Sequence, residues 1–323
     1  MSLLFYTLVY NVGMKKIFLL MCTQILLLAN NPLKMLDEPI TPIPTSVAVN
    51  AQKVVLGKKL FFDTALSKND TISCGSCHIL EDGGDDNLQF SFGINGQKGS
   101  RNAPTVYNAV FNFRQFWDGR AKNLQDQAIG PIENPKEMGF TFQALIPKLQ
   151  QTHYKKEFQE IYQDGITKEN ITDAIAEYEK TLITPNAPFD KYLKGNKKAL
   201  SQDAIQGYEL FKNKGCITCH QGVNIGGNMY NKFGIFHDVK GKDFGRYDVT
   251  HREKDKYYFK VPSLRNVALT APYFHDGRTQ SLHEAVLLMS EYQLGRHITS
   301  EEINKIVVFL NSLTGDLRGS KKQ

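Results

Sequence analysis

The sequence lacks several features that would assign it to large classes of protein. Its 39 Lys and Arg residues are spread along the chain with 33 Asp and Glu and form no basic block, so nucleic-acid binding is unsupported despite a formal charge of +6. No strand-length alternation of apolar and polar residues appears, which argues against a β-rich fold. With 41% hydrophobic and 22% charged residues, the composition is that of a globular protein with a buried core.

An apolar run of membrane-spanning length is also missing. Lys15 and Lys16 precede a short, interrupted apolar run at 17–29, which is typical of a secretory signal. We therefore predict a signal peptide at 14–31 and export to the periplasm, with Met14 as an alternative start because residues 1–13 add nothing that a signal needs. A retained membrane anchor is the alternative. Cys22 lies inside the apolar run and is not interpreted as a lipidation site.

The remaining residues are enough for two domains. The stretch Thr184-Pro-Asn-Ala-Pro188 breaks a helical pattern, so we expect domains at 40–185 and 186–318. Residues 81–104 are rich in Gly, Asp and Asn and predict a long ordered loop. The fold class is mostly α, and the clearest apolar periodicities predict helices at 46–62, 171–182, 203–213 and 301–313.

Cysteine is scarce, and the four residues outside the N-terminal run form one pattern. They occur in Cys74-Gly-Ser-Cys77-His78 and in Cys216-Ile-Thr-Cys219-His220. This motif attaches c-type haem: the two thiols bond to the porphyrin and the imidazole becomes the proximal iron ligand. We therefore predict two covalently bound haem c groups.

Two other uses of paired cysteines are a redox disulfide and a zinc site. A histidine directly follows the second cysteine in both motifs, which gives six good ligands where tetrahedral zinc needs four. The doubled signature therefore favours haem.

The two halves of the chain resemble each other. Phe116-Trp-Asp-Gly-Arg120, followed by Leu124, matches Phe274-His-Asp-Gly-Arg278, followed by Leu282. Upstream, Arg101-Asn-Ala103 pairs with Arg265-Asn-Val267. A duplicated one-haem unit explains this pattern most simply, so we expect two cytochrome-c-like haem domains related by internal duplication.

The sequence around these motifs resembles the bacterial di-haem cytochrome c peroxidases from about Pro44 to Gly315. The similarity is carried by Arg-Asn-Ala-Pro-Thr-Val-Tyr-Asn at 101–108, Phe-Trp-Asp-Gly-Arg at 116–120, Asn-Pro-Lys-Glu-Met-Gly at 134–139, Val-Pro-Ser-Leu-Arg-Asn at 261–266, Ala-Pro-Tyr-Phe-His-Asp-Gly at 271–277 and Gln-Leu-Gly at 293–295. The related quinone-cofactor-maturing di-haem enzymes are the nearest competing subfamily. They have Tyr where Met289 stands, which argues against their radical chemistry here.

The resemblance implies a division of labour between the haems. The N-terminal haem would cleave hydrogen peroxide, and the C-terminal haem would take electrons from a small donor. By motif position, Met289 is the sixth ligand of the C-terminal haem, and Met229 is the alternative. A thioether favours reduced iron, as an electron-entry haem requires.

The family's other site residues can be carried over by position. Glu137 would be the acid–base group, and Gln127 would be the amide that positions peroxide. The alternative for both residues is a solvated surface side chain without a catalytic role. Trp117 would lie between the haems, and core packing is its alternative role. His275 would lie near the C-terminal haem, and a structural histidine with satisfied hydrogen bonds is its alternative role.

The resemblance also implies a Ca²⁺ ion, bound by Asn102 and by the carbonyls of Thr270 and Pro272. It further implies a homodimer and an electron donor that is a small cytochrome c, a cupredoxin or a membrane quinol.

One departure from the family affects the N-terminal haem. Ile94 stands where many members have a histidine that closes the oxidised site, and no histidine occurs between His78 and His153. Asn95 is a poor haem ligand, so we expect an open or water-ligated site. Met138 or His153 are the side chains that could still close it. A di-haem electron carrier with two six-coordinate irons is the main non-enzymatic alternative.

Overall fold

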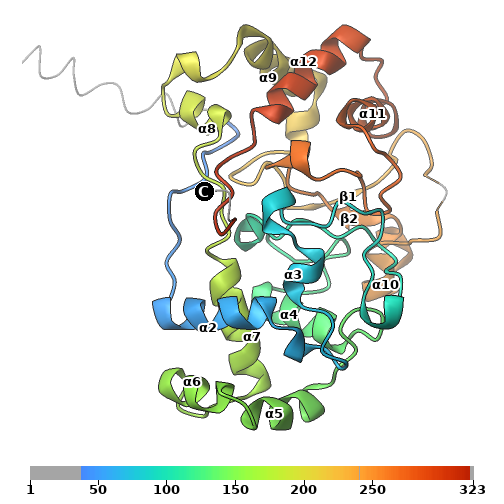
Figure 1. The fold of residues 1–323 in the computed structure, drawn as a ribbon. Coiled ribbons are helices and arrows are strands. Elements are labelled where there is room, and N and C mark those ends of the chain that lie inside the picture. Colours follow the sequence, from blue (N-terminus) through green and yellow to red (C-terminus); the bar gives the residue numbers. More distant parts are fainter. Residues whose placement is uncertain (1–37, 240, 321–323) are drawn as a thin grey trace, which may run out of the picture. The chain divides into compact units, whose positions relative to one another are not determined.

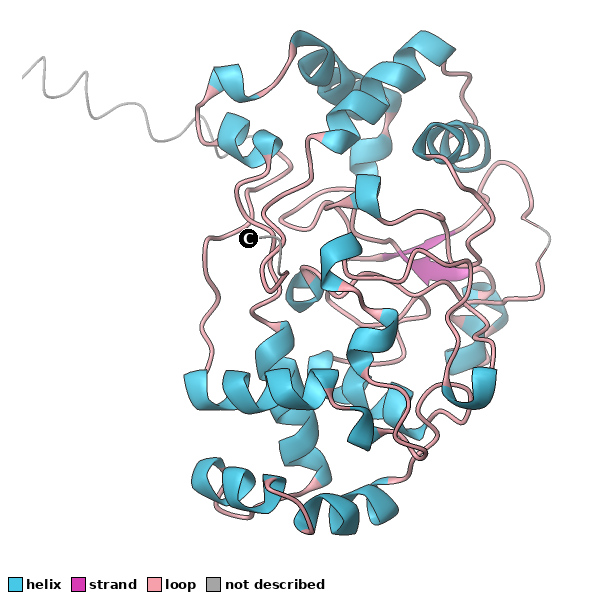
Figure 2. Cartoon of the chain, in the orientation of Figure 1, coloured by secondary structure: helices cyan, strands magenta, loops and turns pink. Residues whose placement is uncertain are grey.

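The computed structural model describes residues 38–239 and 241–320, so the expected signal peptide lies outside the described residues. Pro39–Gln323 forms one compact unit, and its described part is built mainly from helices, as expected (Figures 1 and 2). No helix of the described residues is long and apolar enough to cross a membrane.

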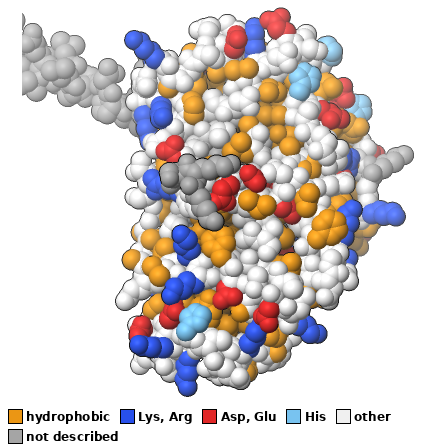
Figure 3. All heavy atoms as spheres, viewed as in Figure 1, with side chains coloured by type: hydrophobic (Ala, Val, Ile, Leu, Met, Phe, Trp, Pro, Cys, Tyr) orange, Lys and Arg blue, Asp and Glu red, His pale blue; other side chains and the backbone are white. Residues whose placement is uncertain are grey.

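The helices are α2 (Ala51–Phe62), α3 (Cys74–Cys77), α4 (Leu124–Glu133), α5 (Phe142–Gln150), α6 (Tyr154–Ile161), α7 (Lys168–Glu179), α8 (Pro188–Leu193), α9 (Gln202–Lys214), α10 (Tyr247–Thr250), α11 (Leu282–Leu288) and α12 (Ser300–Asn311). The strands β1 (Tyr230–Lys232) and β2 (Tyr258–Lys260) pair antiparallel, with Tyr230 opposite Lys260. On the face in Figure 3, Lys and Arg side chains are interspersed with Asp and Glu side chains.

Three of the four predicted helices are found as α7, α9 and α12, and the fourth starts late. Helix α2 begins at Ala51 rather than Ser46, because Asn50 caps it: the Asn50 side chain accepts hydrogen bonds from the backbone N–H groups of Gln52 and Lys53. The Asn50 backbone N–H in turn donates to the Glu177 carboxylate at 2.7 Å. The long loop at 81–104 is also found, with short 3₁₀ turns at Leu80–Asp82 and Ile94–Gly96.

Two pairs of helices cross in the same way, with a glycine at the point of closest approach. Helix α2 packs on α7, and α9 packs on α12 (Figure 1). A Cβ atom on Gly57 would lie 1.8 Å from the Ala174 carbonyl oxygen, and one on Gly207 would lie 1.9 Å from the Lys305 carbonyl oxygen. Only glycine allows the backbones to approach so closely.

The buried apolar side chains form two main clusters. Every buried member of the first lies between Leu56 and Leu182. The second runs from Phe189 to Leu313 and also includes Ile40. These ranges meet at the expected break near residue 185, although the whole of Pro39–Gln323 is one compact unit. The division into two domains therefore stays a prediction.

A matching pair of loops connects the two clusters. Asn108 and Asn266 both have left-handed backbone angles, with φ of 60° and 59°, and a 3₁₀ turn follows each. The amide groups of both side chains donate to the hydroxyl oxygen of Thr184, at 2.8 Å and 3.1 Å. Thr184 therefore joins the corresponding loops of the two halves.

This geometry corrects one pairing that the sequence suggested. The counterpart of Asn266 is Asn108 and not Asn102, because Asn108 precedes Phe116 by the same interval that separates Asn266 from Phe274. Phe116 and Phe274 also share a left-handed backbone, with φ of 67° and 71°. The spacing and the turn conformation therefore pair Asn266 with Asn108 when the two halves are compared.

An ion pair is fully buried in the second cluster. Arg265 donates to the Asp190 carboxylate at 2.7 Å, and both side chains have no exposed surface. Arg265 also donates to the backbone carbonyls of Val223 and Thr41. Burial raises the pKa of Asp190 although the Arg265 charge opposes the shift.

We predict that Arg265→Met lowers the free energy of unfolding by about 3–5 kcal/mol, because it leaves a buried carboxylate without its partner. Denaturant unfolding of the purified protein measures the effect. The matched control is the double variant Arg265→Met/Asp190→Leu, which removes both charges and should lose less than the single variant. Equal losses in both would contradict the explanation.

Candidate functional site

The first Cys-x-x-Cys-His motif forms the short helix α3. Ser73 begins it with a capping box, in which Ser73 and Ser76 satisfy each other's backbone N–H groups. The next residue, His78, has its Nδ1 3.1 Å from the Gly84 carbonyl oxygen. Burial lowers the pKa of His78, which favours the neutral imidazole.

The second motif repeats this arrangement. Cys216–Thr218 forms a 3₁₀ turn, and His220 Nδ1 lies 3.2 Å from the Ile225 carbonyl oxygen. Burial lowers the pKa of His220 to about 4. A neutral imidazole whose Nδ1 is held by a carbonyl presents Nε2 as a ligand for a metal. Both histidines therefore have the protonation state and ring orientation that a proximal ligand of haem iron requires, as the motif predicts.

The alternative uses of the cysteines find no support in the described part of the chain. Cys74, Cys77, Cys216 and Cys219 are all free thiols. Over residues 38–239 and 241–320, no three His, Cys, Asp or Glu side chains gather as a metal site. The arrangement that tetrahedral zinc requires is thus not formed there.

A largely apolar cavity of about 250 Å³ adjoins the second motif. Cys216, Cys219 and His220 line it together with Met289, which begins a π-helical turn at Met289–Gln293. Such turns are frequent at functional sites. Thiols and imidazole beside a thioether in one apolar cavity fit a c-type haem. Met229 is not among the lining residues; its carbonyl accepts a hydrogen bond from the Val261 backbone at 3.0 Å.

Trp117 and His275 lie where the two halves exchange backbone hydrogen bonds. The N–H of Asn102 donates to the His275 carbonyl at 2.8 Å, and the N–H of Lys260 donates to the Trp117 carbonyl at 2.7 Å. The indole N–H of Trp117 also donates to the Asn102 carbonyl at 2.9 Å. The two rings meet edge to face at 6.3 Å, and both line the cavity.

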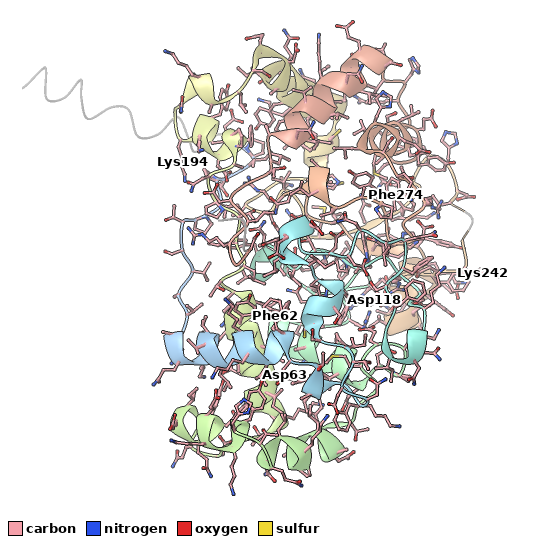
Figure 4. The ribbon with its side chains drawn as sticks, viewed as in Figure 1. Phe62, Asp63, Asp118, Lys194, Lys242 and Phe274 are labelled. Atoms are coloured by element: carbon pink, nitrogen blue, oxygen red, sulfur yellow. The ribbon has the colours of Figure 1, made fainter. Side chains whose placement is uncertain are left out.

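Ion pairs fix the loop that follows Trp117. The buried Asp118 carboxylate pairs with Arg101, whose guanidinium also pairs with Asp243 at 2.6 Å. Arg246 donates to the backbone carbonyls of Asp118 and Gly119 at 2.9 Å each. Asp118 lies among the loops between the two groups of helices (Figure 4). The Trp117 loop is therefore held from both halves.

Glu137 lies close to the first haem motif. Its Oε1 accepts a hydrogen bond from the Asn134 side chain at 2.6 Å. Burial raises its pKa above the usual range of glutamate, although Asn134 and Arg120 oppose the shift. Its charge contributes to the raised pKa values of both Cys74 and Cys77, so the carboxyl group lies near both cysteines.

Gln127 lies on α4, the helix that leads into the Glu137 loop, and it is partly buried. The loop folds back on the end of α4, because the N–H of Met138 donates to the Pro131 carbonyl and that of Phe140 to the Ile132 carbonyl. The two residues implied as the peroxide-binding pair therefore come from one helix and the loop that leaves it.

Ile94 anchors the loop that carries a histidine in many relatives. It is buried, and its backbone N–H donates to the Glu137 carbonyl at 2.8 Å. A Cβ atom on Gly139 would lie 2.4 Å from Ile94 Cδ1, so Gly139 makes room for this side chain. The Asn95 side chain instead accepts a hydrogen bond from Asn69. Ile94 thus packs against the Glu137 loop.

The two side chains considered as substitutes for the histidine are placed differently. His153 is on the surface, with 64% of its side chain exposed, and lies 3.7 Å from Glu157. It is therefore not brought to the first haem motif. Met138 is buried in the first apolar cluster.

The residues implied for calcium line the same cavity. Asn102, Thr270 and Pro272 all line the cavity. The Asn102 side-chain N–H donates a hydrogen bond to the Leu88 carbonyl, so its Oδ1 is available as a ligand for a cation. Asp85 lines the cavity too, with a buried Oδ1 that has no partner in the described residues. Burial raises the pKa of Asp85 to about 8.

Sequence reasoning missed several buried ionisable residues, among them Asp85, Lys260 and Glu179. Glu179 lies at the end of α7, and burial raises its pKa to about 8. The signal for Glu179 was its place four residues after Ile175 on the buried stripe of that helix. Asp85 and Lys260 lie in segments without helical periodicity, so their burial had no sequence signal.

Comparisons with known proteins agree with this geometry. Residues 51–198 match the family model described as di-haem cytochrome c peroxidase. The chain is 49% identical over 286 residues to cytochrome c551 peroxidase of Nitrosomonas europaea, covering 87% of this chain and 85% of that protein. It is 50% identical over 286 residues to cytochrome c peroxidase Ccp of Escherichia coli, covering 86% of this chain and 62% of that longer relative.

A solved structure has a similar fold over most of the chain. It is a MauG-like protein associated with microbial copper homeostasis, 26% identical, with a TM-score of 0.75. The match covers 88% of this chain and 95% of that one. Sequence identity is thus clearly higher to the two peroxidases than to the MauG-like protein.

We predict that Met289→Ala removes the thioether ligand from the haem bound at Cys216 and Cys219, because Met289 lines that cavity. The absorption spectrum of the holoprotein should lose its thioether–iron feature and the potential of that haem should fall. Met229→Ala is the matched control and should leave both unchanged. A loss confined to the Met229 variant would transfer the role to Met229.

Proposed function

Because this chain belongs to the di-haem cytochrome c peroxidase family, we propose that it reduces hydrogen peroxide at the N-terminal haem with electrons that enter at the C-terminal haem. It is a cytochrome c peroxidase with two haem c groups. The observation that carries the proposed roles is an asymmetry: a partly buried acid, Glu137, lies near Cys74 and Cys77, whereas a thioether, Met289, lines the cavity of Cys216 and Cys219.

The haem, when bound, supplies the iron at which the O–O bond breaks and to which electrons are delivered. Reduction of one peroxide to two waters takes two electrons and two protons. Glu137 would take the proton from the oxygen nearer the iron and return it to the departing oxygen. Asn134 holds one of its carboxylate oxygens, which orients the group. Gln127 would position the peroxide through its amide.

The other residues serve electron transfer. Met289 would ligate the C-terminal haem and favour its reduced state. Trp117 and His275 lie between the halves, with rings 6.3 Å apart, and would form the bridge between the haems.

We further propose that the two halves arose by duplication of a one-haem unit. Three repeated features support this: the glycine crossings at Gly57 and Gly207, the left-handed turns at Asn108 and Asn266, and the tied imidazoles of His78 and His220. These features recur in the same order along each half.

A calcium ion is proposed between the halves. Asn102 Oδ1 and the carbonyls of Thr270 and Pro272 supply the oxygen ligands that this hard cation prefers. Burial raises the pKa of Asp85 to about 8, and a cation beside its unpartnered Oδ1 in the same cavity would favour the ionised carboxylate.

We also propose that the enzyme acts in the periplasm as a homodimer. The lysine pair and apolar run at 15–29 support export. A small cytochrome c or a cupredoxin is the proposed donor, with a membrane quinol as the other source of electrons. The alternative function is a di-haem electron carrier, which would have no use for Glu137 at the first motif.

Glu137→Gln should retain both haems and slow peroxide reduction by about 10²–10⁴-fold, because an amide cannot transfer the proton. In the wild type the group must be ionised to accept that proton. Activity should therefore rise with pH through a pKa above the usual glutamate range, and this limb should vanish in the variant. Steady-state turnover with a reduced small donor measures both. Turnover near that of the wild type would remove Glu137 from the mechanism, whereas absent turnover in the wild type itself would favour an electron carrier.

The N-terminal haem should be open or water-ligated when the protein is fully oxidised, because Ile94 packs against the Glu137 loop and cannot bind iron. Peroxide should then react without prior reduction of the C-terminal haem. Electron paramagnetic resonance and stopped-flow mixing with peroxide test this. A wholly low-spin spectrum, with a lag that one-electron reduction abolishes, would show that another ligand closes the site.

A further inference from the structure

Lys260 is a lysine in the interior, at the wall of the cavity that adjoins the second haem motif. It is the last residue of β2, is 6% exposed, and lines the cavity with Cys216, Cys219 and Met289. Two residues later, the Pro262 carbonyl lies by the His220 ring and contributes to its pKa. Lys260 and Pro262 both line this cavity.

No charge in the described part of the chain compensates this ammonium group. Its Nζ makes no hydrogen bond or ion pair with residues 38–239 and 241–320, and the atom is not fully enclosed by protein because Lys260 borders the cavity. Burial alone lowers the pKa of Lys260 to about 8, and no carboxylate contributes. Asp85 lines the same cavity, but Lys260 is not among the charges that shift its pKa. A buried ammonium without a partner is costly, and natural proteins rarely keep one.

The repeated backbone shows what Lys260 replaces. Asn102 and Lys260 are counterparts, because their N–H groups donate to the carbonyls of His275 and Trp117, which are themselves counterparts. Asn102 is the residue proposed to hold a cation by its side-chain oxygen. In the second half the corresponding side chain is itself a cation. With the proposed calcium bound at Asn102, each half would have a positive charge at this position.

We propose that Lys260 is a binding residue of the C-terminal haem, whose ammonium pairs with a propionate carboxylate of that haem and raises its reduction potential. The haem supplies the anion that the chain lacks, since each haem c carries two propionates. A positive charge beside the haem disfavours the ferric state, which has one charge more than the ferrous state. The inference builds on the proposed function only in treating this haem as the entry point of electrons.

The test is a redox titration of both haems in the holoenzyme, without peroxide. Lys260→Gln and Lys260→Met should lower the potential of the C-terminal haem by about 59 mV, which is a tenfold change in the equilibrium constant of a one-electron couple. Lys260→Arg keeps the charge and should stay near the wild type. Lys256→Met removes a partly exposed lysine that pairs with Glu253 and should change nothing. The N-terminal haem serves as the internal reference.

Unchanged potentials in both neutral variants would overturn the proposal, as would an equal fall in Lys260→Arg, which would point to side-chain shape. The haem content of each variant is measured as well, because a variant that fails to bind its second haem gives no potential for that haem. Loss of the second haem in the neutral variants but not in the Arg variant would support the pairing, and loss in all three would overturn it. Absent peroxide turnover in the wild type would refute the proposed function and leave this titration valid.

Discussion

A half-buried imidazole that is hydrogen-bonded to a backbone carbonyl is the constraint on which the rest of the structure depends. His78 and His220 must stay neutral, and each must keep one ring orientation, to bind iron through Nε2. The Gly84 and Ile225 carbonyls fix those orientations at 3.1 Å and 3.2 Å, so the chain must turn back just after each motif. The helix before each motif must also be anchored, and the crossings at Gly57 and Gly207 do so.

The two halves share a similar backbone arrangement, but they carry different side chains at matched positions. Counting from the crossings, Glu179 on α7 corresponds to Leu310 on α12, which lines the C-terminal cavity. A buried acid thus occupies the N-terminal half where an apolar residue occupies the other. Two further matched positions also carry different side chains: Trp117 is matched by His275, and Asn102 is matched by Lys260. In the proposed division of roles, these differences at matched positions would distinguish the peroxide-cleaving haem from the electron-storing haem.

The sequence was sufficient where the signal is local. The haem motifs fix attachment by spacing, and apolar periodicity placed α7, α9 and α12 to within a few residues. It failed where the reason lies in a distant contact. The late start of α2 combines a local cap by Asn50 with a distant contact, the hydrogen bond from the Asn50 N–H to Glu177. The pairing of Asn266 with Asn108 could have been found from the equal intervals to Phe116 and Phe274, and the turn angles support it. The burial of Lys260 and Asp85 follows from tertiary packing, which leaves no pattern in an irregular segment. Gln127, Glu137 and the calcium residues came from family resemblance rather than from spacing.

The exchanged hydrogen bonds between Asn102 and His275, and between Lys260 and Trp117, have a consequence for how the enzyme can be controlled. Lengthening the path between the haems would break backbone bonds on both sides at once, while Arg101 and Arg246 hold the adjacent loop. In the proposed mechanism the distance between the two haems would therefore stay fixed. Control of electron flow would then act at the ends of the path, by changing which groups reach the irons.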